Sequence, residues 1–264
     1  MQGRILIVAG SDSGGGAGIQ ADIKAVTALN GFAMTAITAL TAQNTQGVFG
    51  VHEVPPEFVA EQIRVVMEDI GADVVKTGML GSVAIINAVA DALETFASEL
   101  PWVIDPVMVA KGGHPLLAED AAEALKERLV SRAAVITPNL PEAEVLTGRK
   151  VKAVADMEAA ASALLQTGAK AVLLKGGHLE GDTVVDLLAT AAGIERFESP
   201  RIHTLHTHGT GCTLASAIAC GLAQGMSVRD TVIRARGYVL EAIRTAPGFG
   251  HGHGPLNHAH PLIK

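Results

Sequence analysis

The segment His208-Gly-Thr-Gly-Cys-Thr213 carries the residue types that a site for anionic chemistry needs. It opens an apolar stretch with helical periodicity, and its two glycines let a ligand approach the backbone closely. A helix N-terminus directs several free N–H groups at one point, which suits a phosphate group or its transition state. Cys212 falls in the first turn, where the helix dipole lowers the pKa of a thiol. The segment favours an anion site beside a reactive thiol, although a tight turn with Cys212 as a small buried hydrophobe also fits.

Polar residues also stand where three expected strands end, at positions that an ordinary core avoids. Asp105 ends one apolar run, Asn139 and Glu142 follow the next, and Lys175 ends a third before a Gly-Gly pair. Acidic groups near a phosphate commonly hold Mg²⁺, and a lysine neutralises phosphate charge. Each residue alone also fits a helix cap or a solvated loop. Three such positions at successive strand ends favour a phosphate site.

Two loops near the N-terminus and the tail add weaker signals. The stretch Gly10–Gly18 is rich in glycine, but it lacks both the dinucleotide spacing and the Lys-Ser/Thr ending of a Walker loop, so alone it indicates a flexible turn. Gln43, in the polar stretch 41–47, offers an amide donor and acceptor to the edge of a small heterocycle, or is simply part of a polar loop. Four of the ten histidines lie between His251 and His260, where Gly and Pro leave them unorganised, so we expect no metal there.

Short apolar runs rich in Val and Ile alternate with longer segments of helical periodicity. The runs are nearly continuous, which is typical of strands buried on both faces of a parallel sheet. Repeated βαβ units place helices on both faces, and open α/β sheets bind ligands at the carboxyl ends of their strands. We expect strands at Arg4–Ala9, Ala33–Leu40, Asp73–Lys76, Trp102–Asp105, Ala134–Thr137 and Ala171–Lys175, alternating with helices at Ala17–Leu29, Glu57–Ile70, Ala84–Glu99, Glu119–Val130 and Met157–Gln166.

The pattern changes after Lys175. Thr183–Ala189 and Ile194–Ile202 read as two strands joined by a turn, which predicts a small antiparallel edge, and helices at Thr210–Ala223 and Val228–Thr245 close the fold. We find no linker and no internal repeat. The sequence therefore predicts a single domain, residues 1–264, of α/β class with a mostly parallel central sheet, helices on both faces and a small antiparallel edge.

Composition narrows the function classes. Of 264 residues, 48% are hydrophobic and 18% charged, so the chain can bury a sizeable core. A net charge of −7 and 3% aromatics argue against nucleic-acid binding, which needs positive charge and stacking rings. Cys212 and Cys220 allow no disulfide framework, and no apolar run is long enough for a signal segment or a membrane span. We expect a protein of the reducing cytoplasm, with no nucleic-acid or membrane partner.

Several segments form one set that runs from Val8 to about His258, and as a set they are specific. They are Ala9–Asp22, Thr41-Ala-Gln-Asn-Thr45, Lys76-Thr-Gly-Met-Leu80, Asp105-Pro-Val-Met108, Thr137-Pro-Asn-Leu-Pro-Glu142, Lys175-Gly-Gly-His178, His208–Thr213 and Gly250–His258. This set resembles the hydroxymethylpyrimidine/phosphomethylpyrimidine kinases of thiamin biosynthesis, in the ribokinase superfamily. The resemblance implies a ribokinase-like three-layer sandwich, acting in the cytoplasm as a homodimer. It also implies two successive phosphorylations with ATP and Mg²⁺, first of 4-amino-5-hydroxymethyl-2-methylpyrimidine and then of its monophosphate.

The resemblance also assigns residues to the substrate. It implies that Asp22 and Gln43 read the pyrimidine, with Met79 and Val107 as apolar neighbours. Pyridoxal kinase is the main rival activity, because some enzymes with that activity share the same cysteine-type scaffold. Gln43 favours the aminopyrimidine, since its amide can pair with a ring nitrogen and an exocyclic amine together.

The resemblance implies that catalysis is centred on Cys212, at the position of the catalytic base, where sugar kinases of the superfamily usually carry Asp. Asn139 and Glu142 match the motif that manages Mg²⁺, with Glu142 as the metal residue, and Asp105 and Lys175 face the phosphates. The expected anion hole is formed by Gly209, Thr210 and Gly211.

This sequence departs from the family pattern at two loop positions. Gly14 stands where the family usually has Ser, and His206 stands where Asn is more usual. Both positions lie in loops, so these departures bear on nucleotide affinity rather than on the type of reaction. A non-catalytic pyrimidine-binding regulator of the same fold is a further alternative, and the joint presence of Cys212, Lys175 and Glu142 argues against it.

Overall fold

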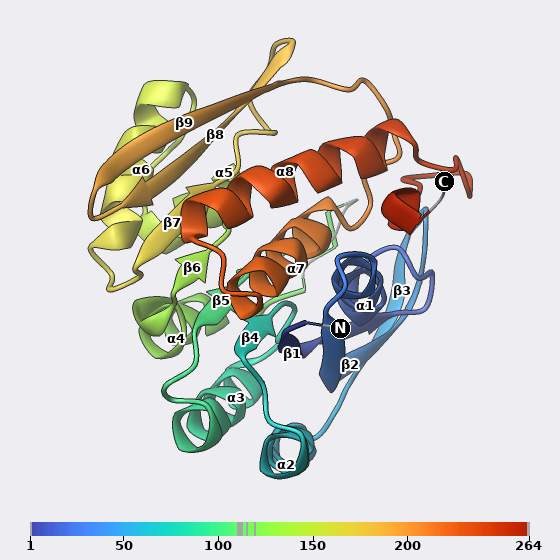
Figure 1. Cartoon of the computed structure of the whole chain (residues 1–264), viewed down its shortest axis with the longest axis vertical. Helices are drawn as coiled ribbons and strands as arrows, with labels where there is room; N and C mark the ends of the chain where they lie inside the picture. The colour runs from blue at the N-terminus through green and yellow to red at the C-terminus, as the bar shows by residue number, and fades with distance from the viewer. Residues whose placement is uncertain (1, 110–112, 115, 119, 263–264) are drawn as a thin grey trace.

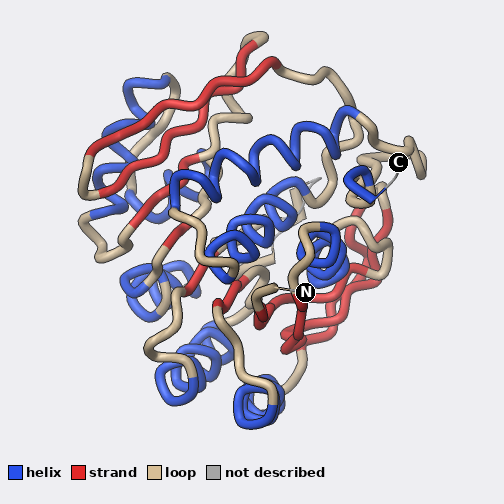
Figure 2. The backbone as a smooth tube through the Cα atoms, in the orientation of Figure 1, coloured by secondary structure: helices blue, strands red, loops and turns tan. Residues whose placement is uncertain are grey.

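The computed structural model describes residues 2–109, 113–114, 116–118 and 120–262, and within them nine strands form one sheet (Figures 1 and 2). The strand order is β3-β2-β1-β4-β5-β6-β7-β8-β9. The strands are β1 (Arg4–Asp12), β2 (Phe32–Asn44), β3 (Gly47–Glu53), β4 (Val74–Thr77), β5 (Trp102–Ile104), β6 (Val135–Ile136), β7 (Ala171–Leu174), β8 (Thr183–Thr190) and β9 (Gly193–Pro200).

The centre of the sheet is parallel. Strands β2, β1, β4, β5, β6 and β7 pair in parallel, so their carboxyl ends share one edge. Strands β8 and β9 form the expected antiparallel edge beside β7. The parallel arrangement brings Asp12, Asp105, Asn139 and Lys175 to the same edge, because each residue ends or follows a strand of this group.

The other end of the sheet, at β2 and β3, is a second antiparallel edge that was not predicted from the sequence. The stretch 41–44, expected to be a loop, continues β2, and β3 folds back on it so that Gln43 pairs with Val48. Strand β3 was missed because Gly47 and Gly50 interrupt its β-branched pattern, and because most of its residues are half-buried or exposed. Gln43 therefore projects from a hydrogen-bonded strand.

Helices cover both faces of the sheet, which confirms the three-layer sandwich (Figure 1). The alternation of side chains in β1 divides the core: Leu6 and Val8 pack towards one group of helices, and Ile5 and Ile7 towards the other. The first group is α2 (Pro56–Asp69), α3 (Val83–Phe96), α4 (Ala121–Arg128), α5 (Leu140–Thr147) and α6 (Val154–Leu165), and the second is α1 (Gly18–Ala28), α7 (Thr210–Ala223) and α8 (Val228–Arg244).

Most expected helices are present with their ends shifted by a few residues. The expected start of α4 at Glu119 lies outside the described residues, and the helix ends at Arg128 before a 3₁₀ turn at Val130–Arg132. Helix α5 was not expected, because at eight residues it is too short to show a clear period. Among the described residues, no helix is long and apolar enough to cross a membrane.

Candidate active site

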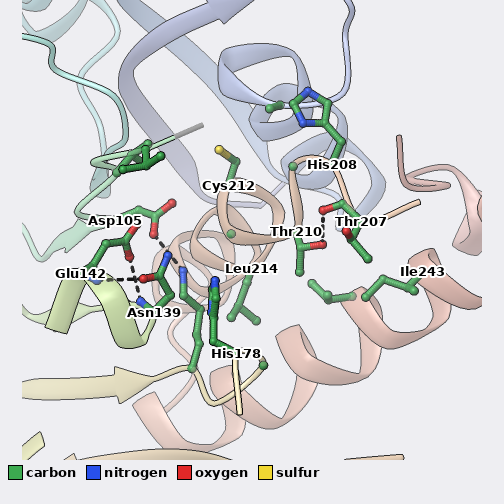
Figure 3. Close-up of a pocket in the computed structure, with 18 of the residues that line it drawn as sticks. Asp105, Asn139, Glu142, His178, Thr207, His208, Thr210, Cys212, Leu214 and Ile243 are labelled. Atoms are coloured by element: carbon green, nitrogen blue, oxygen red, sulfur yellow. Dashed lines mark hydrogen bonds and ion pairs between the residues drawn. The ribbon is translucent and has the colours of Figure 1, made fainter. Parts of the chain in front are cut away.

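A cavity of about 1000 Å³ opens at the carboxyl edge of the parallel strands and extends towards α7 and α8. Figure 3 shows its centre, where side chains from the sheet edge face the N-terminus of α7. All but one of the expected site residues line the cavity, and the exception is Asp22. Those that line it are Gln43, Met79, Asp105, Val107, Asn139, Glu142, Lys175, Gly209, Thr210, Gly211 and Cys212.

The charged centre of the cavity is a Lys175–Asp105 pair. The Lys175 ammonium lies 3.3 Å from Asp105 Oδ1, and the hydroxyl of Thr137 donates to the same oxygen at 2.9 Å. Burial lowers the pKa of Lys175, but the charges of Asp105 and Glu142 outweigh it and raise that pKa above its ordinary value. Lys175 is therefore positively charged at neutral pH, with donors available to an anion in the cavity.

Asn139 and Glu142 form a capping box at the start of α5, drawn in Figure 3. The Asn139 side-chain oxygen accepts from the Glu142 N–H at 2.9 Å, and a Glu142 carboxylate oxygen accepts from the Asn139 N–H at 2.8 Å. Burial, helped by the charge of Asp105, raises the pKa of Glu142 to about 7, although Lys175 opposes the shift. The cap holds the Glu142 carboxyl at the cavity wall, close enough to Asp105 for the two charges to repel.

The carboxyl groups of Asp105 and Glu142 are also the candidate ligands for a magnesium ion. Within the described ranges, no three His, Cys, Asp or Glu side chains are grouped so that they could hold a metal by themselves. Magnesium in phosphoryl transfer needs less, since one or two carboxylates and the phosphates of the nucleotide hold it. The repelling carboxyls of Asp105 and Glu142 fit that requirement, because a divalent cation between carboxylates relieves their repulsion.

The N-terminus of α7 lies next to the Lys175–Asp105 pair. Gly209 is the N-cap with φ of 80°, and a side chain there would collide with the carbonyl oxygen of Gly16. A Cβ on Gly211 would lie 3.2 Å from Lys175 Nζ and 3.6 Å from Asp105 Oδ2. The first-turn N–H groups and the Lys175 ammonium therefore face one small volume, which is an anion-binding arrangement.

The glycine-rich loop is fixed by Asp12, a residue that sequence reasoning missed. Its carboxylate accepts from the N–H groups of Gly14, Gly16 and Ala17 at 2.8, 3.0 and 2.8 Å, and His208 Nε2 lies 2.8 Å away. Burial opposes ionisation, but the His208 contact and the backbone donors lower the pKa of Asp12. The Asp12–His208 contact ties the loop to the approach of α7, so the loop is not the flexible turn that its composition suggested. An Asp that bonds the N–H groups just after it is a turn signal that could have been noticed.

Gln43 lines the cavity from the end of β2. The Thr41 hydroxyl lies 3.0 Å from the Gln43 side-chain oxygen and 2.9 Å from the Ser11 carbonyl oxygen, and its one proton is shared between these two acceptors. The Gln43 amide nitrogen lies 3.4 Å from His208 Nε2. Met79 lines the same cavity and packs against Gly10, where a Cβ would lie 3.1 Å from the Met79 sulfur. This part of the cavity combines one carboxamide with apolar walls, as recognition of a small heterocycle requires.

Asp22 is not at this wall, which corrects the implied contact with the pyrimidine. Its side chain is fully buried, and its two carboxylate oxygens both accept from Lys76 Nζ at 2.9 Å. Ser216 on α7 also donates to Asp22, at 2.7 Å. Asp22 is one helical turn beyond Gly18, which does line the cavity, and this turn places the carboxylate behind the wall.

The environment of Cys212 also differs from the expectation. Burial raises the pKa of its thiol to about 12, and the charges of Asp22 and Asp105 add to the shift while Lys76 opposes it. The helix dipole was expected to lower this pKa, and desolvation outweighs it. Cys212 therefore lines the cavity as a protonated thiol at neutral pH.

The histidine-rich tail packs against the same helix. His258 Nε2 lies 2.9 Å from the Thr213 hydroxyl, which donates to the Gly209 carbonyl at 2.8 Å. Burial lowers the pKa of His258 to about 4, so its ring is neutral at neutral pH and donates to Thr213. His206 lies against Gly254 of the tail and does not line the cavity. The departure at position 206 therefore concerns tail packing, and the tail braces the first turn of α7.

The sequence model of one protein family, described as phosphomethylpyrimidine kinase, matches residues 12–257. The chain is 54% identical, over 97% of its length, to the thiamine biosynthesis bifunctional protein ThiED of Geobacter sulfurreducens, and it spans about half (52%) of that longer protein. It is 49% identical to the hydroxymethylpyrimidine/phosphomethylpyrimidine kinase of Streptomyces coelicolor, over 98% of this chain and 95% of that one.

Solved structures with the same fold include kinases of two names. A pyridoxal kinase of Bacillus subtilis in an ADP complex matches with a TM-score of 0.92 and 37% identity over 100% of both chains. A phosphomethylpyrimidine kinase from Clostridium difficile matches with a TM-score of 0.81 and 42% identity, over 91% of this chain and 99% of that one. A Staphylococcus aureus pyridoxal kinase in complex with AMP-PCP and pyridoxal matches with a TM-score of 0.89 and 32% identity, over 98% of this chain and 94% of that one.

Proposed function

This chain belongs to the phosphomethylpyrimidine kinase family, and on that premise we propose that it phosphorylates 4-amino-5-hydroxymethyl-2-methylpyrimidine and then the resulting monophosphate. It is a phosphotransferase of thiamine biosynthesis, with ATP as the donor, and it shares its fold with a kinase that binds the ATP analogue AMP-PCP. The observation that carries the proposal is one cavity that combines a carboxamide, a thiol at a helix N-terminus and a Lys–Asp pair next to that N-terminus.

The pyrimidine would occupy the Gln43 end of the cavity. The Gln43 carboxamide lies between the Thr41 hydroxyl and His208, and it can accept from the exocyclic amine while it donates to the adjacent ring nitrogen. Met79 and Val107 supply apolar contacts to the ring. The hydroxymethyl group then points towards Cys212, in the middle of the cavity.

The first phosphorylation needs a base. The substrate hydroxyl oxygen bonds to the γ-phosphorus of ATP, the bond from that phosphorus to the bridging oxygen breaks, and ADP leaves. The Cys212 thiol first loses its own proton to water, and the resulting thiolate then receives the hydroxyl proton of the substrate. The N–H groups of the α7 first turn and the Lys175 ammonium stabilise the charge on the transferred group. Since burial raises the thiol pKa to about 12, the rate of this step should rise as pH increases from 7 to 9.

The second phosphorylation differs chemically. Its nucleophile is a phosphate oxygen, and the second pKa of a phosphate monoester is about 6. At pH 8 that oxygen has already lost its proton, so the step needs no base. Cys212 is therefore needed as a base in the first phosphoryl transfer and is not needed as a base in the second.

Magnesium, when bound, neutralises charge on the phosphates of ATP. We assign its protein ligands to Asp105 and Glu142, whose carboxyls repel each other at the cavity wall. Asn139 supports this role by holding Glu142 through the capping box rather than by facing the metal itself.

Pyridoxal kinase activity is the second candidate, because solved pyridoxal kinases share the fold over nearly the whole chain. Purified protein should be assayed for ADP release with ATP and Mg²⁺ against each substrate, with products identified by mass spectrometry. We expect the pyrimidine to give monophosphate and then diphosphate, and kcat/KM to be higher than for pyridoxal. A higher kcat/KM for pyridoxal would reverse the assignment, and binding of the pyrimidine without ADP release would make the protein a regulator.

We extend the proposal to the assembly and its location. Strand β3 is a sheet edge that exposes Phe49 and Val51, and an unpaired edge with apolar side chains is a surface for a second copy. We propose a homodimer, to be checked by light scattering, in which residues 1–264 of each chain act as one domain. The requirement for ATP favours the cytoplasm as the compartment.

A further inference from the structure

A charged network lies behind Cys212, outside the cavity, and the mechanism above does not use it. Lys76 and Asp22 both have 0% exposed side chains, and the ammonium lies 2.9 Å from each carboxylate oxygen. Ser216 donates to Asp22 at 2.7 Å. An ion pair removed from water costs free energy unless its hydrogen bonds are satisfied, and replacing it with apolar residues is often neutral or stabilising. Fold stability alone is therefore a weak explanation for this buried ion pair beside the Cys212 thiol.

The network reaches Cys212 through two packed helices. On α7, Ser216 follows Cys212 by four residues, so both side chains lie on one helix face. On α1, Asp22 follows Gly18 by four residues. Asp22 bonds Ser216, and the backbone N–H of Gly18 acts to lower the pKa of the Cys212 thiol. The two contacts occur one turn apart and join the same helix faces. Lys76, from β4, completes the network between the helices and the sheet.

The charges around the thiol come from four elements. Lys76 on β4 favours the thiolate, Asp22 on α1 and Asp105 after β5 disfavour it, and Lys175 after β7 also interacts with it. Burial lowers the pKa of Lys76, but Asp22, Cys212 and Asp105 together raise it above its ordinary value. Lys76 therefore keeps its proton and cannot serve as the base. It is a fixed positive charge that no ligand in the cavity can contact.

We propose that Lys76 is a positioning residue for Cys212: its ammonium, kept charged by Asp22, which Ser216 holds in place, stabilises the thiolate that receives the substrate proton. Lys76 exchanges no proton itself. The inference deepens the proposed function and rests on it for its purpose, but the effect on the thiol exists without any substrate. It also explains why a carboxylate occupies position 22, since without Asp22 the buried ammonium would lose its proton.

The test is the rate of Cys212 alkylation by iodoacetamide, a neutral reagent, in substrate-free protein between pH 7 and 10. All proteins carry Cys220→Ala, so that Cys212 is the only thiol. Removing an opposite charge at this range shifts a pKa by about 1–3 units. Because a more basic thiolate is also more nucleophilic, we expect Lys76→Met to slow alkylation about 3- to 40-fold, with the slope against pH unchanged. Lys150→Met, which removes an exposed partner of Glu144, is the matched control and should leave the rate unchanged.

Lys76→Met leaves Asp22 buried without a partner and can fail to fold, so the double variant Lys76→Met/Asp22→Asn provides a second test. Lys76 influences the Cys212 thiol more than Asp22 does, so the double variant should also slow alkylation, about threefold. Rates within 1.5-fold of the parent in every folded variant, or a faster rate in either, would overturn the inference.

The alkylation test separates this inference from the proposed function. If wild-type protein phosphorylates no pyrimidine but Lys76→Met slows alkylation, the proposed function fails and the role of Lys76 towards the thiol stands. If the wild type is active but alkylation does not respond, only the role of Lys76 fails. In the active enzyme, Lys76→Met should lower kcat for the hydroxyl substrate and leave KM for ATP unchanged, because Lys76 does not line the cavity.

Discussion

Two Lys–Asp pairs lie at the carboxyl ends of parallel strands, and they differ in what can reach them. Lys76 and Asp22 are both 0% exposed, with the ammonium 2.9 Å from each oxygen. Lys175 and Asp105 are 15% and 2% exposed, 3.3 Å apart, and both line the cavity. The first pair is closed on itself, whereas the second is open to a ligand.

Burial, rather than residue type, therefore decides what each charge pair does in this molecule. The closed pair can influence chemistry only through a neighbour, and its neighbour is Cys212. The open pair can meet phosphates directly, because the Lys175 ammonium has three donors and, among the described residues, makes one contact of 3.3 Å, to Asp105. Substitutions at the two pairs should therefore affect different kinetic constants.

The largest of these effects should come from the open pair. Lys175→Met removes a positive charge that stabilises the transferred phosphoryl group, and we expect kcat/KM for ATP to fall about 10²–10³-fold. Steady-state kinetics with varied ATP measure this, with Lys76→Met as the comparison, since it should leave KM for ATP unchanged. Equal increases of KM for ATP in both variants would erase the distinction between the pairs.

The next largest effect should be on pyrimidine affinity, which depends on Gln43 in the proposed complex. Gln43→Ala leaves polar atoms of the bound ring unpaired and should weaken pyrimidine binding by about 1–3 kcal/mol, or about 5- to 150-fold. Calorimetric titration measures this affinity, and ATP affinity serves as the internal control. Asp22→Asn should change pyrimidine affinity less than twofold. If it weakens pyrimidine binding as much as Gln43→Ala does, the ring binds at the Lys76–Asp22 pair instead.

The smallest effect concerns Glu142, beside the open pair. Glu142→Gln keeps the capping box acceptor but removes a charge, so the Mg²⁺ concentration for half-maximal rate should rise about tenfold. Titration of the rate with Mg²⁺ tests this at fixed ATP. An unchanged half-maximal concentration would remove Glu142 from the metal site.

The raised pKa of Glu142 also predicts a pH dependence of stability. Between its ordinary pKa of 4.5 and the folded value of about 7, the unfolded carboxyl is ionised while the folded one keeps its proton. The free energy of unfolding contributed by Glu142 therefore falls as pH rises through this window. Denaturant unfolding of wild type and Glu142→Gln, compared pH by pH, should show a steeper fall in the wild type. Parallel curves would mean that the folded carboxyl ionises normally.

The sequence predicted the open pair and not the closed one, and the reason is geometric. Asp105 and Lys175 follow strands directly, and strand ends are identifiable from apolar runs. Asp22 lies in a helix next to cavity-lining Gly18, and one turn of helix moved it behind the wall. Lys76 ends a run of apolar residues like Lys175 does, but its burial depends on α1 and α7, which meet it from distant parts of the chain.

Most of the fold was predictable because parallel strands buried on both faces are continuous apolar runs. Strand β3 and helix α5 were missed, one because it is glycine-interrupted and exposed, the other because it is short. The direction of the Cys212 pKa shift was wrong for a different reason. The helix dipole is visible in the sequence, whereas the desolvation that outweighs it depends on the packing of α1 against α7.

The most direct test of the mechanism compares the two phosphorylations in Cys212→Ala. At pH 8 the hydroxyl substrate needs a base and the monophosphate does not, so we expect kcat for the first transfer to fall about 10²–10⁴-fold. The kcat for the second transfer should fall less than tenfold, with the affinities for ATP and pyrimidine close to those of the wild type. Near-full kcat for the first transfer, or equal losses for both, would contradict Cys212 as the base that receives the hydroxyl proton.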